Sequence, residues 1–216
     1  MVSYLPTVFS SAGAACPFAG YRCCILTSVD DLFDSPVLRI RQPGKLLPSR
    51  ARYEIFSAQR QRLAIATETE AHTRRELFSN MLPDDRVLIV TTVTGEPVLT
   101  LIKHSKEWLA DLHRPGGELV GRIRVAGTRR HYTLIGDQDQ AVAEVVGDLG
   151  LRHFTVTSAG GGKIAQVSKT WAGLAKEMLT PSDHYKVQFD GSVPEPARTL
   201  TVMLPIVLDL TVYGPV

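Results

Sequence analysis

Length, composition and charge exclude several classes of protein. The chain has 216 residues, with 24 Lys and Arg against 22 Asp and Glu, and its net charge of +2 is too small to indicate a nucleic-acid partner. A hydrophobic content of 44% describes an ordinary globular protein, long enough to bury a core in one large domain or two small ones. Three cysteines near the N-terminus, two of them adjacent, do not suggest a disulfide framework, so we expect a reducing compartment.

The first 32 residues differ from the rest of the chain. No Lys or Arg precedes Arg22 and no clear cleavage pattern follows it, which argues against a secretory signal. Residues 32–36 look like the natural beginning of a domain. We expect residues 1–32 to be a disordered extension or an over-long assigned start, and residues 33–216 to form the domain.

Residues 53–81 predict a hairpin followed by a helix. Two apolar segments flank a polar turn within residues 53–66, which predicts two short strands. Residues 68–81 begin with acidic side chains and end at a Leu-Pro pair, so they predict an exposed, charged helix.

Four short apolar segments recur at a period of 22 residues in the middle of the chain. Each follows a turn rich in residues that tolerate hairpin geometry, and a strand-like segment precedes each turn. The repeated unit is therefore a β-hairpin. The strands before the turns are 87–93, 107–112, 132–135 and 154–157, and those after them are 98–101, 120–123, 142–145 and 164–167.

Residues 200–212 form an apolar run whose length lies between that of a core helix and that of a membrane span. Asp209 and Pro205 favour the core, because a carboxylate is costly in a bilayer and proline removes a backbone donor. A meander of about five hairpins favours closure, since closure removes exposed strand edges. We therefore predict a mostly β protein, a closed antiparallel barrel filled by this helix, with Leu204 and Leu208 in the core.

The residues after the fourth hairpin carry a family resemblance. They read K-x-W-x-G-x-x-K-E at 169–177 and D-x-Y-x-V-x-F at 183–189, before the apolar run. This order resembles the phospholipid scramblase family and its LURP-one-related relatives, which share the Tubby C-terminal-like fold. The resemblance covers residues 33–213 and includes a small residue after three of the turns (Gly121, Ala143, Ala165). It implies about twelve strands around the C-terminal helix, with Trp171 and Tyr185 in the core.

The family is associated with calcium through an acidic stretch that this chain keeps only in part. Asp183 matches it and Asp190 lies nearby, whereas Pro181 and Ser192 stand where acidic residues are expected. Calcium takes six to eight oxygen ligands, which one or two carboxylates cannot supply without many backbone or water ligands. Asp183 and Asp190 are therefore weak metal candidates, and we expect no cofactor.

The sequence lacks residues that known catalytic motifs require. The Gly-rich residues 159–163 resemble a phosphate-binding loop, but Thr157 replaces its first glycine and Ile164 follows the lysine. The nucleophile motif G-x-S-x-G is absent, and the cysteines lack a convincing histidine partner. We therefore expect a protein that is not an enzyme.

Two groups of basic residues are the candidates for membrane contact. The first lies in residues 39–52, which contain no acidic side chain, and near an anionic leaflet each basic residue contributes about 1 kcal/mol. The alternative, of equal weight, is that these side chains simply alternate outward along barrel strands. The candidates are Arg39, Arg41, Lys45, Arg50 and Arg52 in the first group, and Arg122, Arg124, Arg129 and Arg130 in the second.

Two functions follow from the resemblance. The first is a phospholipid-binding protein at an anionic membrane surface, cytoplasmic and peripheral at the inner face of the plasma membrane, in which calcium-dependent scrambling is doubtful. The second is a soluble scaffold or regulator that uses the barrel for protein or small-ligand contacts. Fold alone does not choose between them.

Overall fold

A computed structural model describes residues 29–43, 50–69, 85–104, 107–170 and 184–212. These residues form two helices, α1 (Val29–Asp34) and α3 (Ala197–Val212), and twelve strands. The strands are β1 (Val37–Arg41), β2 (Arg52–Ser57), β3 (Arg62–Glu68), β4 (Arg86–Thr92), β5 (Pro97–His104), β6 (Leu109–His113), β7 (Leu119–Val125), β8 (His131–Gly136), β9 (Ala141–Gly147), β10 (His153–Ser158), β11 (Lys163–Thr170) and β12 (His184–Phe189).

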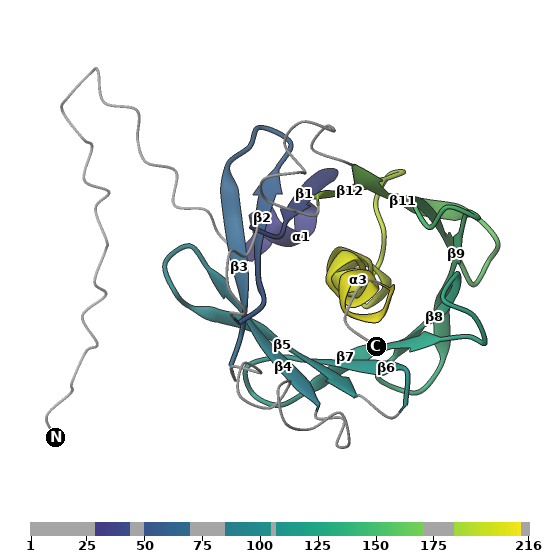
Figure 1. The fold of residues 1–216 in the computed structure, drawn as a ribbon, viewed down its shortest axis with the longest axis horizontal. Helices are drawn as coiled ribbons and strands as arrows, with labels where there is room; N and C mark the ends of the chain where they lie inside the picture. Colours follow the sequence, from purple (N-terminus) through teal and green to yellow (C-terminus); the bar gives the residue numbers. More distant parts are fainter. Residues whose placement is uncertain (1–28, 44–49, 70–84, 105–106, 171–183, 213–216) are drawn as a thin grey trace, which may run out of the picture.

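The twelve strands close into one antiparallel barrel. Strands β2 to β12 pair in chain order, and β1 closes the ring by pairing with both β2 and β12. Figure 1 shows the ring with α3 seen end-on at its centre. The predicted fold class is therefore confirmed, and the repeated hairpins correspond to β4–β5, β6–β7, β8–β9 and β10–β11.

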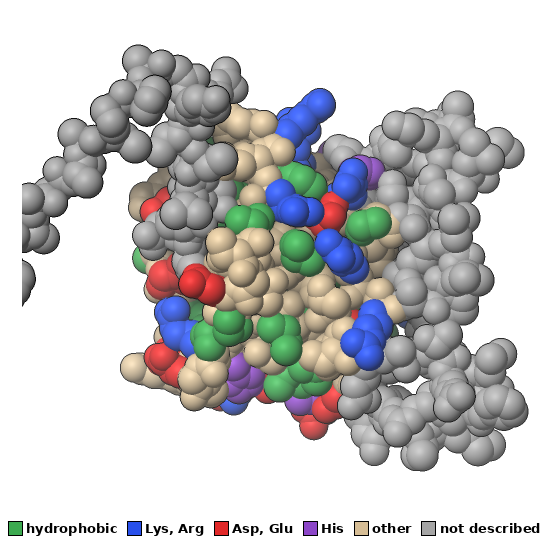
Figure 2. Space-filling model, turned by 90° about the vertical axis from the view of Figure 1, so that its left-hand side faces the viewer, with side chains coloured by type: hydrophobic (Ala, Val, Ile, Leu, Met, Phe, Trp, Pro, Cys, Tyr) green, Lys and Arg blue, Asp and Glu red, His purple; other side chains and the backbone are tan. Residues whose placement is uncertain are grey.

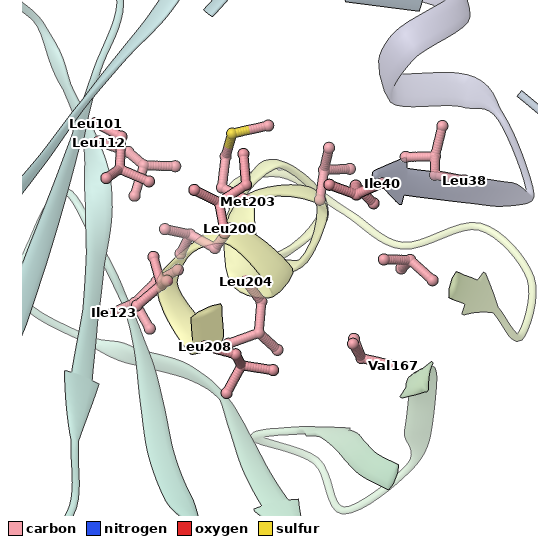
Figure 3. Packing of buried hydrophobic residues seen from close by; sticks show 14 of the residues in the cluster. Leu38, Ile40, Leu101, Leu112, Ile123, Val167, Leu200, Met203, Leu204 and Leu208 are labelled. Atoms are coloured by element: carbon pink, nitrogen blue, oxygen red, sulfur yellow. The ribbon is translucent and has the colours of Figure 1, made fainter. Parts of the chain in front are cut away.

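Helix α3 is the core of the barrel. Every residue from Ala197 to Thr211 is buried, and Leu204 and Leu208 have no exposed surface. Figure 3 shows these leucines facing apolar side chains from strands on different sides of the ring. A helix that is apolar all round needs this surrounding sheet. Among the described residues, no helix combines the length and the apolar character needed to cross a membrane.

Pro205 lies inside α3 without ending it. Proline cannot donate a backbone hydrogen bond to the preceding turn, so the helix has to be stabilised from elsewhere. Hydroxyl groups on either side donate to other carbonyls, Thr201 to that of Ala197 and Thr211 to that of Val207, each at 2.7 Å, so neither replaces the amide that Pro205 lacks. Tertiary burial on all sides of α3 therefore overrides the local cost of Pro205.

Most strand ends shift by one to three residues from the sequence prediction, and three differences have a physical reason. The predicted helix at 68–81 is wrong at its first residue, because Glu68 ends β3 and its carboxylate is buried; residues 70–81 lie outside the described residues. Strand β6 begins at Leu109 instead of 107, since Trp108 takes a positive φ of 50° that a strand does not accept. Helix α3 begins at Ala197, three residues earlier than predicted.

The described fold also includes α1, most of which precedes the predicted domain start at residue 33. Leu32 is only 1% exposed and belongs to the central core. The Arg198 guanidinium, at the start of α3, donates to the carbonyls of Phe33 and Ser35 and stacks over the Phe189 ring. Residues 29–32 are thus part of the packed structure.

Candidate functional site

The barrel has two ends that differ in their connections. We call the end where α3 begins the turn end; it holds the short turns of the β2–β3, β4–β5, β6–β7, β8–β9 and β10–β11 hairpins. We call the opposite end, where α3 ends, the basic end. It holds the connections β1–β2, β3–β4, β5–β6, β7–β8, β9–β10 and β11–β12.

Charge is distributed unequally between these ends. We count described residues in the connections and at strand termini. The basic end has seven basic and four acidic side chains, whereas the turn end has four basic and six acidic ones. At the basic end they are Arg41, Arg50, Arg52, Arg86, Arg129, Arg130, Arg152, Glu68, Asp85, Glu107 and Asp148. At the turn end they are Arg60, Arg62, Arg114, Lys163, Glu96, Glu118, Asp137, Asp139, Asp190 and Glu195.

Five chain segments outside the described residues do not change the net charge of the basic end. Residues 44–49, 70–84, 105–106, 171–183 and 213–216 all connect to the described chain at the basic end. By sequence they contain five basic and five acidic residues, so they add no net charge. The positive excess at the basic end therefore comes from the described residues.

Three residues of the first predicted basic group, Arg39, Arg41 and Arg52, lie on the outer face of β1 and β2. The Glu54 carboxylate is nearly buried between arginines, 2.5 Å from Arg41 and 3.7 Å from both Arg52 and Arg62. Arg39 stands in register with Lys186 on one side and Phe56 on the other. Figure 2 shows this side of the barrel, with Lys and Arg side chains around an acidic one and hydrophobic side chains among them.

Two members of this face lie outside the predicted basic groups. Arg62 and Lys186 are distant in sequence from residues 39–52, and only the pairing of β1 with β12 and of β2 with β3 brings them together. Alternate side chains of β12 point outward, and this alternation could have indicated from sequence that Lys186 is on the outer face. Arg50 is exposed beside β2, and Lys45 lies outside the described residues.

The second predicted basic group divides into residues with different surroundings. Arg122 is held between two carboxylates, 3.4 Å from Asp111 and 3.2 Å from Asp139. Arg124 is exposed on β7, while Arg129 and Arg130 lie in the β7–β8 connection at the basic end. Arg122 is therefore already compensated, and the other three remain candidates for an external anion.

The two groups lie on opposite sides of the barrel but reach the same end. Six strand positions separate β1 from β7 in the ring, so the outer faces of these strands point away from each other. Arg41, Arg50 and Arg52 nevertheless lie at the basic end, as do Arg129 and Arg130. A flat surface can contact both groups only if it meets this end of the barrel.

Comparison with known proteins places this barrel in a family. A family model described as Scramblase matches residues 48–214, more than half of the chain. The chain belongs to the Scramblase family. A crystal structure of a protein from Arabidopsis thaliana superposes with a TM-score of 0.50 at 14% identity, over 81% of this chain and 91% of that one, and supports the same fold. A comparison with curated proteins finds no match.

Of the two weak calcium candidates in this Scramblase-family protein, the structure describes Asp190 alone. Asp190 is half-exposed, and its carboxylate lies 3.1 Å from the Lys163 ammonium, a cation that opposes a second one. Asp183 lies outside the described residues; His184, which follows it, is about 20 Å along β12 from Asp190 at the usual strand rise. Within the described ranges, no group of three or more His, Cys, Asp or Glu could hold a metal ion.

Beneath the basic end, the Scramblase-family core contains a buried polar network. Asp209 of α3 accepts hydrogen bonds from the hydroxyls of Tyr53, at 2.7 Å, and Tyr185, at 3.2 Å. Burial first, and then the negative charge of Asp209, raises the pKa of Tyr53 well above its usual range, so the phenol keeps its proton. These bonds fix the end of α3, and Tyr185 is buried; Trp171 lies outside the described residues.

Proposed function

We propose that this protein binds anionic phospholipid surfaces peripherally, with the basic end facing the headgroups. The observation that carries the proposal is the excess of basic over acidic side chains at one end of the barrel, with the reverse at the other end. Membership of the Scramblase family supports a phospholipid as the partner. Proximity to an anionic leaflet contributes about 1 kcal/mol per basic residue, and salt screens this attraction.

The geometry favours an end-on contact over a lateral one. On the side of β1 and β2, part of the arginine charge is neutralised by Glu54, and a lateral contact leaves Arg129 and Arg130 on the far side. An end-on contact brings Arg50, Arg130 and Arg152 toward the same plane. It also places the acidic turn end farthest from the anionic lipids, which lowers repulsion.

The proposal concerns binding and does not assign lipid translocation to α3. Side chains on all faces of α3 are buried inside the barrel, so this helix has no surface to offer to lipid. Calcium is not required in the proposed contact, because arginines meet the phosphates directly. The activity is therefore a non-catalytic, salt-sensitive association.

Vesicle co-sedimentation tests the proposal. The protein is mixed with anionic or neutral vesicles at low and at high salt, beside a double variant, Arg50→Glu with Arg130→Glu. We expect sedimentation with anionic vesicles at low salt only, and a loss of at least about tenfold in apparent affinity in the double variant, because two reversals remove four units of charge.

A variant with the same change of charge at the other end is the control. Arg60→Glu with Arg114→Glu alters the net charge equally at exposed turn-end positions and should sediment like the unchanged protein. Equal retention in the supernatant under every condition would refute membrane binding and favour the scaffold function. Equal losses in both double variants would show that net charge, rather than the basic end, governs the contact.

A further inference from the structure

Three connections at the basic end form one continuous rim. The β7–β8 connection lies in the middle and is joined by the backbone to both neighbours. The Trp108 carbonyl accepts from the Val125 amide at 2.9 Å, and the Arg130 carbonyl accepts from the Gly147 amide at 2.7 Å. We call this surface the Leu149 rim, and it comprises Trp108, Arg129, Arg130, Leu149 and Arg152.

Leu149 is held outward by an ordered turn. The Leu151 amide donates to the Asp148 carbonyl at 3.1 Å, and the Asp148 carboxylate accepts from the amides of Arg152, at 2.7 Å, and His153, at 3.2 Å. Leu151 packs against the core, whereas Leu149 is 89% exposed. The turn therefore presents one leucine to the core and the other to the outside.

Asp148 keeps its charge in this turn. Burial alone would raise its pKa, but the amides of His153 and Arg152 donate to the carboxylate and lower it overall. The turn is therefore pre-organised at neutral pH. Little conformational entropy is lost when Leu149 moves from water into a less polar environment.

Trp108 is the second exposed apolar side chain of the rim. It is 48% exposed, and the Arg129 guanidinium lies over its ring, 5.6 Å from the centroid. The same guanidinium donates to the Val212 carbonyl, 3.5 Å away, at the end of α3. Arg129 thus contacts both the indole and the end of α3 from the β7–β8 connection.

Exposed apolar surface concentrates here. Among described residues, the exposed large hydrophobic side chains are Ile89, Val93, Trp108, Val146 and Leu149, and Leu149 is by far the most exposed. Val146 faces outward on β9, one residue before the strand ends at Gly147 beside the rim. Large apolar side chains on loop tips, with arginines around them, suit a surface that has anionic headgroups above an apolar interior.

We propose that Leu149 and Trp108 insert into the interfacial layer of an anionic phospholipid bilayer while Arg129, Arg130 and Arg152 stay among the phosphates. This inference rests on the proposed function and adds the depth and orientation of the contact. Charge brings the basic end to the surface, and burial of Leu149 and the indole then holds it there. Because apolar burial is not screened, part of the binding survives high salt.

The test compares two matched substitutions of exposed apolar residues, Leu149→Asn at the rim and Val93→Asn in the β4–β5 turn. Partition coefficients are measured with anionic vesicles at low and high salt. We expect Leu149→Asn to lower the partition coefficient about tenfold and to reduce the salt-resistant part to the share that Trp108 supplies. Val93→Asn should stay within about twofold of the unchanged protein, because it lies at the turn end.

The outcomes separate the two proposals. If the unchanged protein binds no vesicle, the proposed function fails. If it binds in a salt-sensitive manner and Leu149→Asn binds equally well, membrane association stands and insertion is refuted. Loss of binding in Val93→Asn to the same degree as in Leu149→Asn would also refute a specific role of the rim.

Fluorescence quenching measures the position of the indole. Vesicles with lipids brominated near the headgroup end of their chains should quench the emission of the unchanged protein. Most of that quenching should be absent in Trp108→Phe, a conservative change at an exposed position. The chain has a second tryptophan, Trp171, so the absolute loss of emission is compared. An equal absolute loss in both proteins would show that Trp108 stays outside the bilayer.

Discussion

His104 lies between two carboxylates, with Nδ1 2.9 Å from Asp85 and Nε2 3.1 Å from Asp111. Only the imidazolium donates from both nitrogens, so this geometry favours the charged ring. Burial lowers the pKa of His104, but the hydrogen bonds and charges of Asp85 and Asp111 outweigh it and raise the pKa above its usual value. The histidine thus joins β5 to β6 and to the chain entering β4.

Stability should therefore depend on pH through this residue. Because the pKa is raised in the folded state, the contribution of His104 is fully present below the unfolded pKa of 6.5 and is lost as pH rises through the folded pKa. We expect the stability difference between the unchanged protein and His104→Gln to shrink from about pH 6 to about pH 9, measured by urea unfolding.

His113→Gln is the control for this measurement. The His113 ring contacts the Gly117 carbonyl and has no carboxylate partner among the described residues. A stability difference for His104→Gln that stays constant over this pH range would contradict the assignment.

Residue-level predictions from sequence were limited by strand register. Arg122 and Arg124 looked equivalent in sequence, yet the pairing of β6 with β7 places Asp111 opposite Arg122. The Glu54 carboxylate similarly draws Arg62 to Arg41 and Arg52, although β3 was not among the candidate segments. Side-chain partners across strands depend on pairing, and a single sequence does not state which residues pair.

Among the elements, β7 comes especially close to α3. A β-carbon on Gly121 would lie 2.3 Å from the Ile135 carbonyl oxygen and 3.1 Å from a methyl carbon of Leu200. The equivalent positions of the next two hairpins carry Ala143 and Ala165, which are buried. The small residues that recur after the turns are therefore buried, and at Gly121 the space does not admit a β-carbon without a shift.

Gly121→Ala should destabilise the fold by about 1–3 kcal/mol, because the new methyl group displaces the β8 backbone or the start of α3. Thermal or urea unfolding measures the loss. Gly162→Ala is the matched control, since its nearest neighbour would be the Ser158 hydroxyl at 3.7 Å and its φ is not positive. Equal stability of both variants would show that β7 and α3 adjust freely.

At the element level, local patterns predicted strands better than they predicted the β3–β4 connection. Alternating apolar residues and turn chemistry identified the hairpins because both signals lie within a few residues. Glu68 looked like the start of a helix, but its carboxylate accepts from the Arg86 side chain at 2.8 Å and the Ala51 amide at 2.9 Å. Ala51 and Arg86 lie 17 and 18 residues away, so the acidic start of the predicted helix could not reveal them.

At the scale of the whole molecule, α3 and the barrel depend on each other. The apolar side chains of α3 have no other place to be buried, and the inward side chains of the strands have no other core. Leu204→Lys or Leu208→Lys should therefore unfold the entire domain, because an unpaired buried charge costs several kcal/mol, comparable with the total stability.

Circular dichroism and thermal melting check this outcome, with Val93→Lys at an exposed turn as the control. We expect the control to melt cooperatively and the two core variants to lack a cooperative transition. A soluble, folded product from either core variant would contradict the assignment of α3 as the core.

The sequence predicted the overall architecture, but the charge distribution over the molecule emerged only with the fold. The basic groups around Arg39 and Arg122 were visible as clusters in the chain. Their convergence on one end depends on the direction of each strand in the ring and on which connections share an end. The fold therefore distinguishes the candidate arginines at the basic end from Arg122, whose charge is compensated by Asp111.

The position of α3 in the chain also constrains how the protein is made. All twelve strands leave the ribosome before the helix that fills them, and β1 meets β12 only after nearly the whole domain has been synthesised. Until α3 has been synthesised, the apolar inner faces of the nascent hairpins stay exposed to solvent. Exposed apolar surface and unpaired strand edges promote aggregation. We expect chaperone demand during translation to end only when synthesis has passed Val212 and α3 can enter the ring.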